Sequence, residues 1–133
     1  MILLLDTSTG LCKLTFVEGE KQSEYEWQAD RTLADNLLGF LEEKCALQRI
    51  ALQNISGIGV MKGPGSFTGL RIGLAVMNTI ASELQVPIVG TTGEDWQHNA
   101  LERLKNGQND HLVVPEYGRD ANITLPRKNN SQE

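Results

Sequence analysis

The N-terminal part of the chain consists of three short runs with the spacing of β-strands. Residues 2–5 are all apolar, as in a central strand that is buried on both faces. Residues 11–17 and 23–28 instead alternate between apolar and polar positions, and a polar turn at 18–21 joins them. No long connection separates the three runs, so the pattern predicts an antiparallel meander with one solvated side.

The next part of the chain alternates between helical stripes and short apolar runs. Residues 33–45 have an apolar residue at every fourth position, which predicts a helix, and Thr32 with Asp35 resembles a capping box at its start. Two strands and two helices are predicted to follow in alternation, at 55–61, 68–85, 86–91 and 94–106. We expect Thr92 to cap the last helix and Gly107 to follow its end.

The resulting order is β-β-β-α-β-α-β-α, and it predicts an α/β fold with a mixed five-stranded sheet. The sheet is mixed because strands linked through a helix run parallel, whereas the meander is antiparallel. This is the element order of the RNase H-like fold. We expect residues 1–110 to form one such domain and residues 111–133 to form a partly disordered C-terminal extension.

Composition narrows the classes of function. The 133 residues carry a net charge of −5, which argues against direct binding to a phosphate backbone. The apolar run at residues 1–5 is too short for a membrane segment or a signal peptide, so a cytoplasmic protein without a membrane partner is expected. Cys12 and Cys45 have no ligand spacing and are interpreted as small core residues.

The most informative motif is the glycine-rich string at residues 62–73, which joins a predicted strand to a predicted helix. Backbone N–H groups at such a junction can hold an anion, although the spacing is not that of a P-loop. The alternative, which the physics favours, is a tight turn whose Ser66 or Thr68 caps the helix. Asp6 ends the first strand and is interpreted as bonding the following turn. The candidates for a phosphate or nucleotide contact are Asp6, Thr7, Gly63, Gly65 and Ser66.

The helix predicted behind this loop is apolar on two sides. One stripe holds Leu70, Leu74 and Met77, and a second holds Ile72, Val76 and Ile80. A helix that lies on a sheet needs one stripe, and leaving the second in water would forgo about 1.5–3 kcal/mol for each side chain. A neighbour is therefore expected: either another helix of the domain or, as we favour, a partner chain. Small residues such as Gly69 and Gly73 would let that neighbour approach the helix closely. The predicted interface is Gly69, Ile72, Gly73, Val76, Met77 and Ile80.

No set of residues indicates a catalytic centre. His98 and His111 have no metal-ligand spacing, and the acidic residues lie at turns and helix starts. The sequence assigns no catalytic residue, no metal site and no cofactor.

Two strings of residues resemble the TsaB (YeaZ) family. They are Leu4–Thr9 and the run from Lys62 to Gly73, and Pro87–Gly90 is similar as well. The resemblance covers about residues 1–105 and resumes at Pro115, Tyr117, Arg119-Asp120 and Pro126–Lys128. Residues 106–110 stand where the family has a second RNase H-like half, and Leu33-Ala34 stands where it often has His-Ser.

The resemblance implies a non-catalytic scaffold subunit with an ASKHA-type lobe, in a one-lobe form. Such subunits pair with TsaD, which transfers a threonylcarbamoyl group to A37 of tRNAs that read ANN codons, and an ATPase subunit, TsaE, joins them. The pairing uses the helix after the Gly-Pro-Gly loop, and tRNA is met only through the complex. On this basis Ile72→Glu or Gly73→Leu is predicted to leave the fold broadly intact and to abolish co-purification with TsaD.

Two alternatives remain open at this point. A small stand-alone nucleotide-binding hydrolase or peptidase predicts ATP turnover that is lost on Asp6→Ala or Ser66→Ala. A self-associating protein predicts a homodimer built on the same apolar helix, which is compatible with a heterodimer once TsaD is present.

Overall fold

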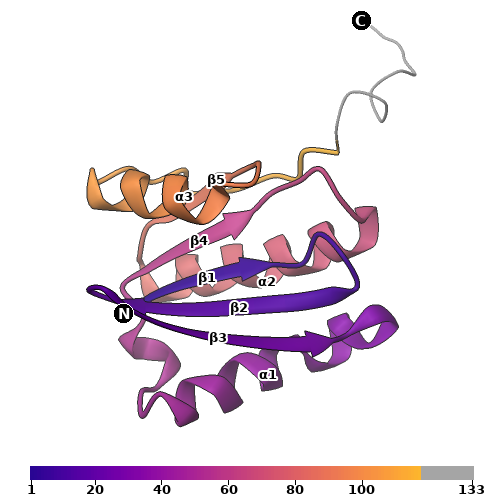
Figure 1. The fold of residues 1–133 in the computed structure, drawn as a ribbon, viewed down its shortest axis with the longest axis horizontal. Coiled ribbons are helices and arrows are strands. Elements are labelled where there is room, and N and C mark those ends of the chain that lie inside the picture. The colour runs from indigo at the N-terminus through magenta and orange to yellow at the C-terminus, as the bar shows by residue number, and fades with distance from the viewer. Residues whose placement is uncertain (118–133) are drawn as a thin grey trace, which may run out of the picture.

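The computed structural model describes residues 1–117, which form a mixed five-stranded sheet flanked by three α-helices (Figure 1). The strands and helices, in chain order and with two short 3-10 helices, are β1 (Ile2–Asp6), β2 (Leu11–Glu18), β3 (Lys21–Gln28), η1 (Asp30–Thr32), α1 (Leu33–Leu47), η2 (Leu52–Asn54), β4 (Gly57–Met61), α2 (Phe67–Leu84), β5 (Ile88–Thr91) and α3 (Trp96–Lys105). The strand order in space is β3-β2-β1-β4-β5. The first three strands pair antiparallel, and β4 joins β1 and β5 in parallel. The predicted α/β class and mixed sheet are confirmed.

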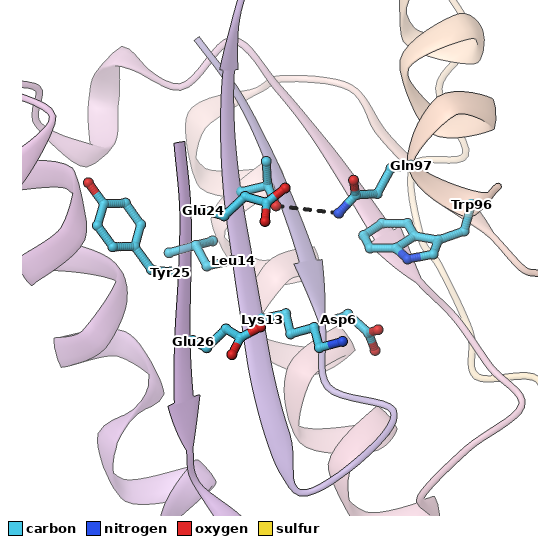
Figure 2. A pocket seen from close by; sticks show the side chains of 9 residues that line it. Asp6, Lys13, Leu14, Glu24, Tyr25, Glu26, Trp96 and Gln97 are labelled. Atoms are coloured by element: carbon cyan, nitrogen blue, oxygen red, sulfur yellow. Dashed lines mark hydrogen bonds between the residues drawn. The ribbon is translucent and has the colours of Figure 1, made fainter. Parts of the chain in front are cut away.

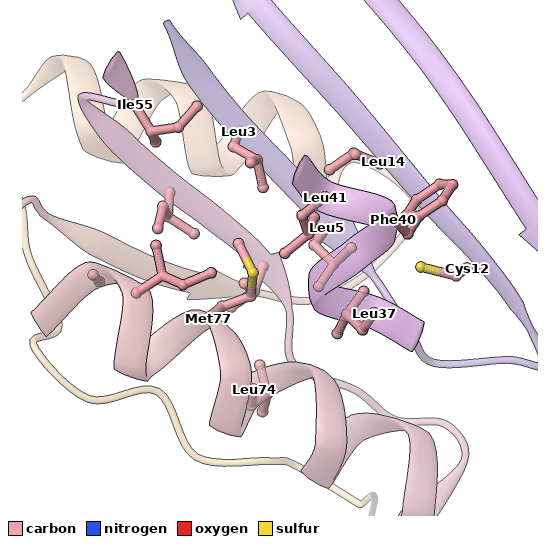
Figure 3. Close-up of a cluster of buried hydrophobic side chains, with 14 of the residues drawn as sticks. Leu3, Leu5, Cys12, Leu14, Leu37, Phe40, Leu41, Ile55, Leu74 and Met77 are labelled. Atoms are coloured by element: carbon pink, nitrogen blue, oxygen red, sulfur yellow. The ribbon is translucent and has the colours of Figure 1, made fainter. Parts of the chain in front are cut away.

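The sheet is buried on both faces in its centre. Leu3 and Leu5 point into the larger core, which α1 and α2 cover, while Leu4 points into a smaller core under α3. All three side chains are at most 2% exposed, as a continuous apolar run requires. Figure 3 shows the larger core, where side chains of the sheet meet Leu37 from α1 and Met77 from α2.

The second apolar stripe of α2 is partly accounted for inside the domain. Helices α1 and α2 lie on the same face of the sheet and contact each other (Figure 1). Ile80 is buried in the larger core, and Ile72 and Val76 pack against it while staying partly accessible. The predicted neighbour of this stripe is thus found in part within the domain, and the apolar surface left for a partner chain is smaller than the sequence predicts. Helix α1 supplies part of that neighbour.

Two predicted helix caps are wrong. The Thr32 hydroxyl donates to the carbonyl of Ala29 at 2.7 Å, within the turn η1, and does not cap α1. Helix α3 begins at Trp96 rather than at residue 94, and it follows Asp95 without a side-chain cap. Thr92 therefore lies before the helix and caps nothing. Gly107 does follow the end of α3 as predicted, with φ of 79°.

Residues 109–117, here named the strap, run from β5 along α2 to the loop that precedes α2. Val113 of the strap is buried. The backbone N–H of Asp110 donates to Ile88 in β5, and that of Glu116 donates to Lys62, the residue after β4. The division at residue 110 stays a prediction. The predicted disorder of the last residues, and the family-like residues from Arg119 onward, lie outside the described part of the chain. No helix in residues 1–117 is both long and apolar enough to cross a membrane.

Candidate functional site

The glycine-rich loop before α2 packs against the turn that follows β1. The backbone N–H of Ser66 donates to the carbonyl of Ser8 at 2.7 Å. A Cβ added at Gly65 would lie 2.6 Å from Cβ of Ser8, which a side chain would not tolerate. The structure thus brings the two predicted strings together, and the space between them is filled by the chain itself.

Thr7 is the residue that makes the two helical glycines necessary. Its hydroxyl donates to the carbonyl of Gly69 at 2.8 Å, and the residue is 2% exposed. A Cβ at Gly69 would overlap the carbonyl oxygen of Thr7, and one at Gly73 would overlap its Oγ1. The expectation that these glycines admit a second helix is therefore wrong, because the turn after β1 occupies that space.

Ser66 caps α2, as one of the two alternatives predicted. Its Oγ accepts from the N–H of Gly69 at 3.1 Å. This bond satisfies one of the free N–H groups of the first helical turn. Gly65 and Ser66 are exposed, whereas Gly63 is buried and lies against the carbonyl of Glu116 in the strap. Any phosphate contact at this loop remains a prediction.

Asp6 bonds the turn after β1, which confirms the interpretation from sequence. Its Oδ1 accepts from the N–H of Ser8 at 2.8 Å and from the Ser8 hydroxyl at 2.6 Å. Asp6 also lines a shallow polar hollow of about 200 Å³ beside α3 (Figure 2). There Lys13 lies opposite Asp6 in one strand pair and opposite Glu26 in the next. Unlike charges thus alternate across three strands.

The predicted interface residues do not all reach the surface. Gly69, Gly73, Met77 and Ile80 are buried within the domain. Of the six, Ile72 and Val76 are accessible to a partner, since both are partly exposed. The surface of α2 available to another chain is thus narrower than the sequence indicated.

A second part of the accessible apolar surface escaped the sequence reasoning. Phe67, at the start of α2, is 57% exposed, and its ring lies 4.8 Å from that of Tyr117, while Arg71 lies 5.0 Å above it. Leu112 and Val114 of the strap are 65% and 61% exposed. Strap and α2 border a groove of about 450 Å³. The sequence signal for this surface is the apolar run at 112–114, which lies within the range 111–133 that is predicted to form an extension.

The two cysteines are buried, as interpreted from the sequence. Burial, with the nearby charge of Asp6, raises the pKa of the Cys12 thiol to about 12. Burial also raises the pKa of Cys45. At both positions burial thus disfavours the thiolate, which is the form that metals and electrophiles require. Within residues 1–117, no three His, Cys, Asp or Glu side chains are placed to hold a metal ion together.

Comparison with protein families and named proteins finds a match to the TsaD family model and relatives that are named TsaB. The family model for TsaD, described as tRNA N6-adenosine threonylcarbamoyltransferase, matches residues 27–120. The chain is 51% identical over 68 residues to the tRNA threonylcarbamoyladenosine biosynthesis protein TsaB of Bacillus subtilis, covering 50% of the chain and 27% of that protein. It is 28% identical over 108 residues to TsaB of Haemophilus influenzae, covering 81% and 46%. With TsaB of Escherichia coli it shares 25% over 131 residues, covering 91% and 56%.

Two solved structures of YeaZ-like proteins resemble this chain. YeaZ from Pseudomonas aeruginosa superposes with a TM-score of 0.64 at 30% identity, covering 68% of this chain and 43% of that one. A second structure, described as an uncharacterized protein with similarity to peptidase YeaZ from Pseudomonas aeruginosa, gives the same TM-score and identity. The chain covers only part of the length of these relatives, from 27% to 56% among the three TsaB proteins.

Proposed function

Because the chain belongs to the TsaB (YeaZ) family, we propose that it is a non-catalytic subunit that binds and activates a TsaD-type threonylcarbamoyltransferase. The reaction it would serve is the threonylcarbamoyl modification of adenosine 37 in tRNAs that read ANN codons. The observation that carries the proposal is the accessible apolar surface along α2. Ile72 and Val76 are partly exposed there, and Phe67 is 57% exposed.

Covering this surface gives a physical reason for a partner. A fully buried aliphatic side chain contributes about 1.5–3 kcal/mol relative to an exposed one, and these side chains are only partly buried by the lobe itself. The net charge of −5 fits a subunit that leaves tRNA binding to its partner. We include a TsaE-type ATPase subunit and a cytoplasmic location in the proposal, on the family relationship alone.

The test is the affinity of the chain for the TsaD-type subunit of its own organism, measured by calorimetry. Ile72→Glu is expected to weaken binding by at least about 100-fold, which is about 2.8 kcal/mol, because an unpaired carboxylate would enter an apolar contact. Asn99→Glu is the matched control, since Asn99 is exposed on α3, across the sheet. Circular dichroism must show both variants folded. Equal affinity of Ile72→Glu and the wild type would remove α2 as the interface.

Gly73→Leu is not a suitable second interface variant. A side chain at residue 73 collides with Thr7 inside the domain, so loss of binding would report damage to the fold. This corrects the expectation that the substitution leaves the fold intact.

The self-associating alternative uses the same surface and is tested in the same experiment. Light scattering of the isolated chain distinguishes a homodimer from a monomer, and addition of the TsaD-type subunit shows whether a heterodimer replaces it. A dimer that persists, with no TsaD binding, would favour self-association. ATP turnover by the isolated chain that is lost on Asp6→Ala would favour the hydrolase alternative.

A further inference from the structure

The loop that precedes α2, residues 62–66, lies between two other parts of the chain. On one side is the turn after β1, where Ser8 accepts the hydrogen bond from the N–H of Ser66 at 2.7 Å. On the other side is the strap. The N–H of Glu116 donates to the carbonyl of Lys62 at 2.7 Å, and the ring of Tyr117 lies 4.8 Å from that of Phe67.

The strap is itself anchored by side chains rather than by regular sheet pairing. At its start, the Asp110 carboxylate accepts from the N–H of Gly90 at 2.9 Å and from two nitrogens of Arg103, one of them at 3.0 Å. The side-chain oxygen Oδ1 of Asn109 accepts from the N–H of Ile88 at 3.1 Å. These bonds satisfy backbone N–H groups of the edge strand β5 that would otherwise face solvent.

The middle of the strap is anchored to α2. The Asn78 amide donates to the carbonyl of Val113 at 2.8 Å and accepts from its N–H at 2.9 Å, as a neighbouring strand would. Val113 is 4% exposed, and it lies where a side chain at Gly90 would be. The strap thus has two anchors before it reaches the loop.

We propose that the strap is a brace that holds residues 62–66 against the turn after β1. The two anchors fix the course of the strap, and its last described residues, Glu116 and Tyr117, then close the loop from the side opposite Ser8. Because the loop leads into the first turn of α2, the strap also sets how Phe67 is presented at the surface. The proposal concerns the isolated chain and holds whether or not α2 binds a TsaD-type subunit.

The test is amide hydrogen exchange followed by NMR on the full chain. Asn78→Ala/Asp110→Ala removes a side chain from each anchor. The amides of Val113 and Glu116 report release of the strap, and that of Ser66 reports the loop. The amide of Ile58, which donates to the carbonyl of Pro87 at 3.0 Å in the sheet, reports global unfolding.

We expect exchange at Val113, Glu116 and Ser66 to rise by at least about tenfold relative to Ile58. The control Gln48→Ala/Asn54→Ala also removes two hydrogen-bonding side chains, which contact Tyr25 and Ala51 away from the strap. It should leave Ser66 protected. Release of the strap without faster exchange at Ser66 would overturn the proposal, and so would a strap that stays protected.

If the double variant does not fold, Tyr117→Ala provides the same test with less damage. It removes the contact with Phe67, which is itself mostly exposed. Ser66 should again exchange faster relative to Ile58, and unchanged exchange at Ser66 would count against the brace.

Discussion

Substitution of Gly73 by alanine tests whether Thr7, and not a partner helix, is the reason for a glycine at this position. The added Cβ would overlap Oγ1 of Thr7 and would lie 2.9 Å from its Cγ2 and 3.0 Å from its Cβ. The neighbour cannot yield easily, because Thr7 is 2% exposed and its hydroxyl donates to the carbonyl of Gly69. Either the turn after β1 moves or the helix does.

The expected loss of stability follows from three contributions. Overpacking of a close-packed site costs about 1–3 kcal/mol. Losing the hydrogen bond from Thr7 to Gly69 costs about 1 kcal/mol. Alanine in place of glycine inside a helix raises the free energy of unfolding by about 1 kcal/mol. Gly73→Ala should therefore destabilise the chain by about 1–3 kcal/mol, measured as the free energy of unfolding in urea with an unchanged m-value.

Gly39→Ala is the matched control, because a Cβ at Gly39 in α1 meets nothing within 4 Å. It should stabilise the chain by about 0.5–1 kcal/mol. Thr7→Ala removes Oγ1 and Cγ2, so in the double variant with Gly73→Ala the cost should be at least about 1 kcal/mol less than the sum of the single costs. Stabilisation by Gly73→Ala comparable to that by Gly39→Ala would show that Thr7 does not require a glycine at residue 73.

The hydrogen bond from the Arg103 guanidinium lowers the pKa of Asp110. The pair therefore stabilises the fold fully above the unfolded pKa of about 3.9, and this stability is lost as the pH falls through the lower folded pKa. The difference in urea midpoint between the wild type and Asp110→Asn should be present at pH 7 and shrink in acid, and a difference that stays constant would contradict this. Cys12 and Cys45 should not react with a disulfide reagent at pH 8 in the folded chain, since burial raises the pKa of both thiols. Both should react in urea. Fast labelling of the native chain would show that the two thiols are accessible. Ser66→Ala should cost about 0.5–2 kcal/mol of unfolding free energy and Ser66→Asp much less, because aspartate can still cap the helix; equal losses in the two variants would argue against the cap.

The secondary-structure elements of this protein and their order can be predicted from its sequence pattern. Alternation at 11–17 indicates a strand because side chains of a strand point to opposite faces with a period of two. The continuous apolar run at 2–5 indicates a central strand that is buried on both faces. The string at 62–73 identified both the loop and the family, and the cap at Ser66 was among the alternatives it predicted. These features depend on residues near one another in the chain, and such features can be read from local spacing.

What each apolar or small residue contacts depends on the tertiary fold and cannot be read from local spacing. A stripe on α2 shows that one side of the helix is buried, but not whether α1, the sheet or another chain buries it. Gly73 is a glycine because of Thr7, which lies 66 positions earlier in the sequence. The strap could not be recognised from its composition, because it is anchored to a backbone N–H group of β5 and to single polar side chains on α3 and α2. Periodicity records which side of an element avoids water, whereas the surface that it meets is set by how distant parts of the chain pack.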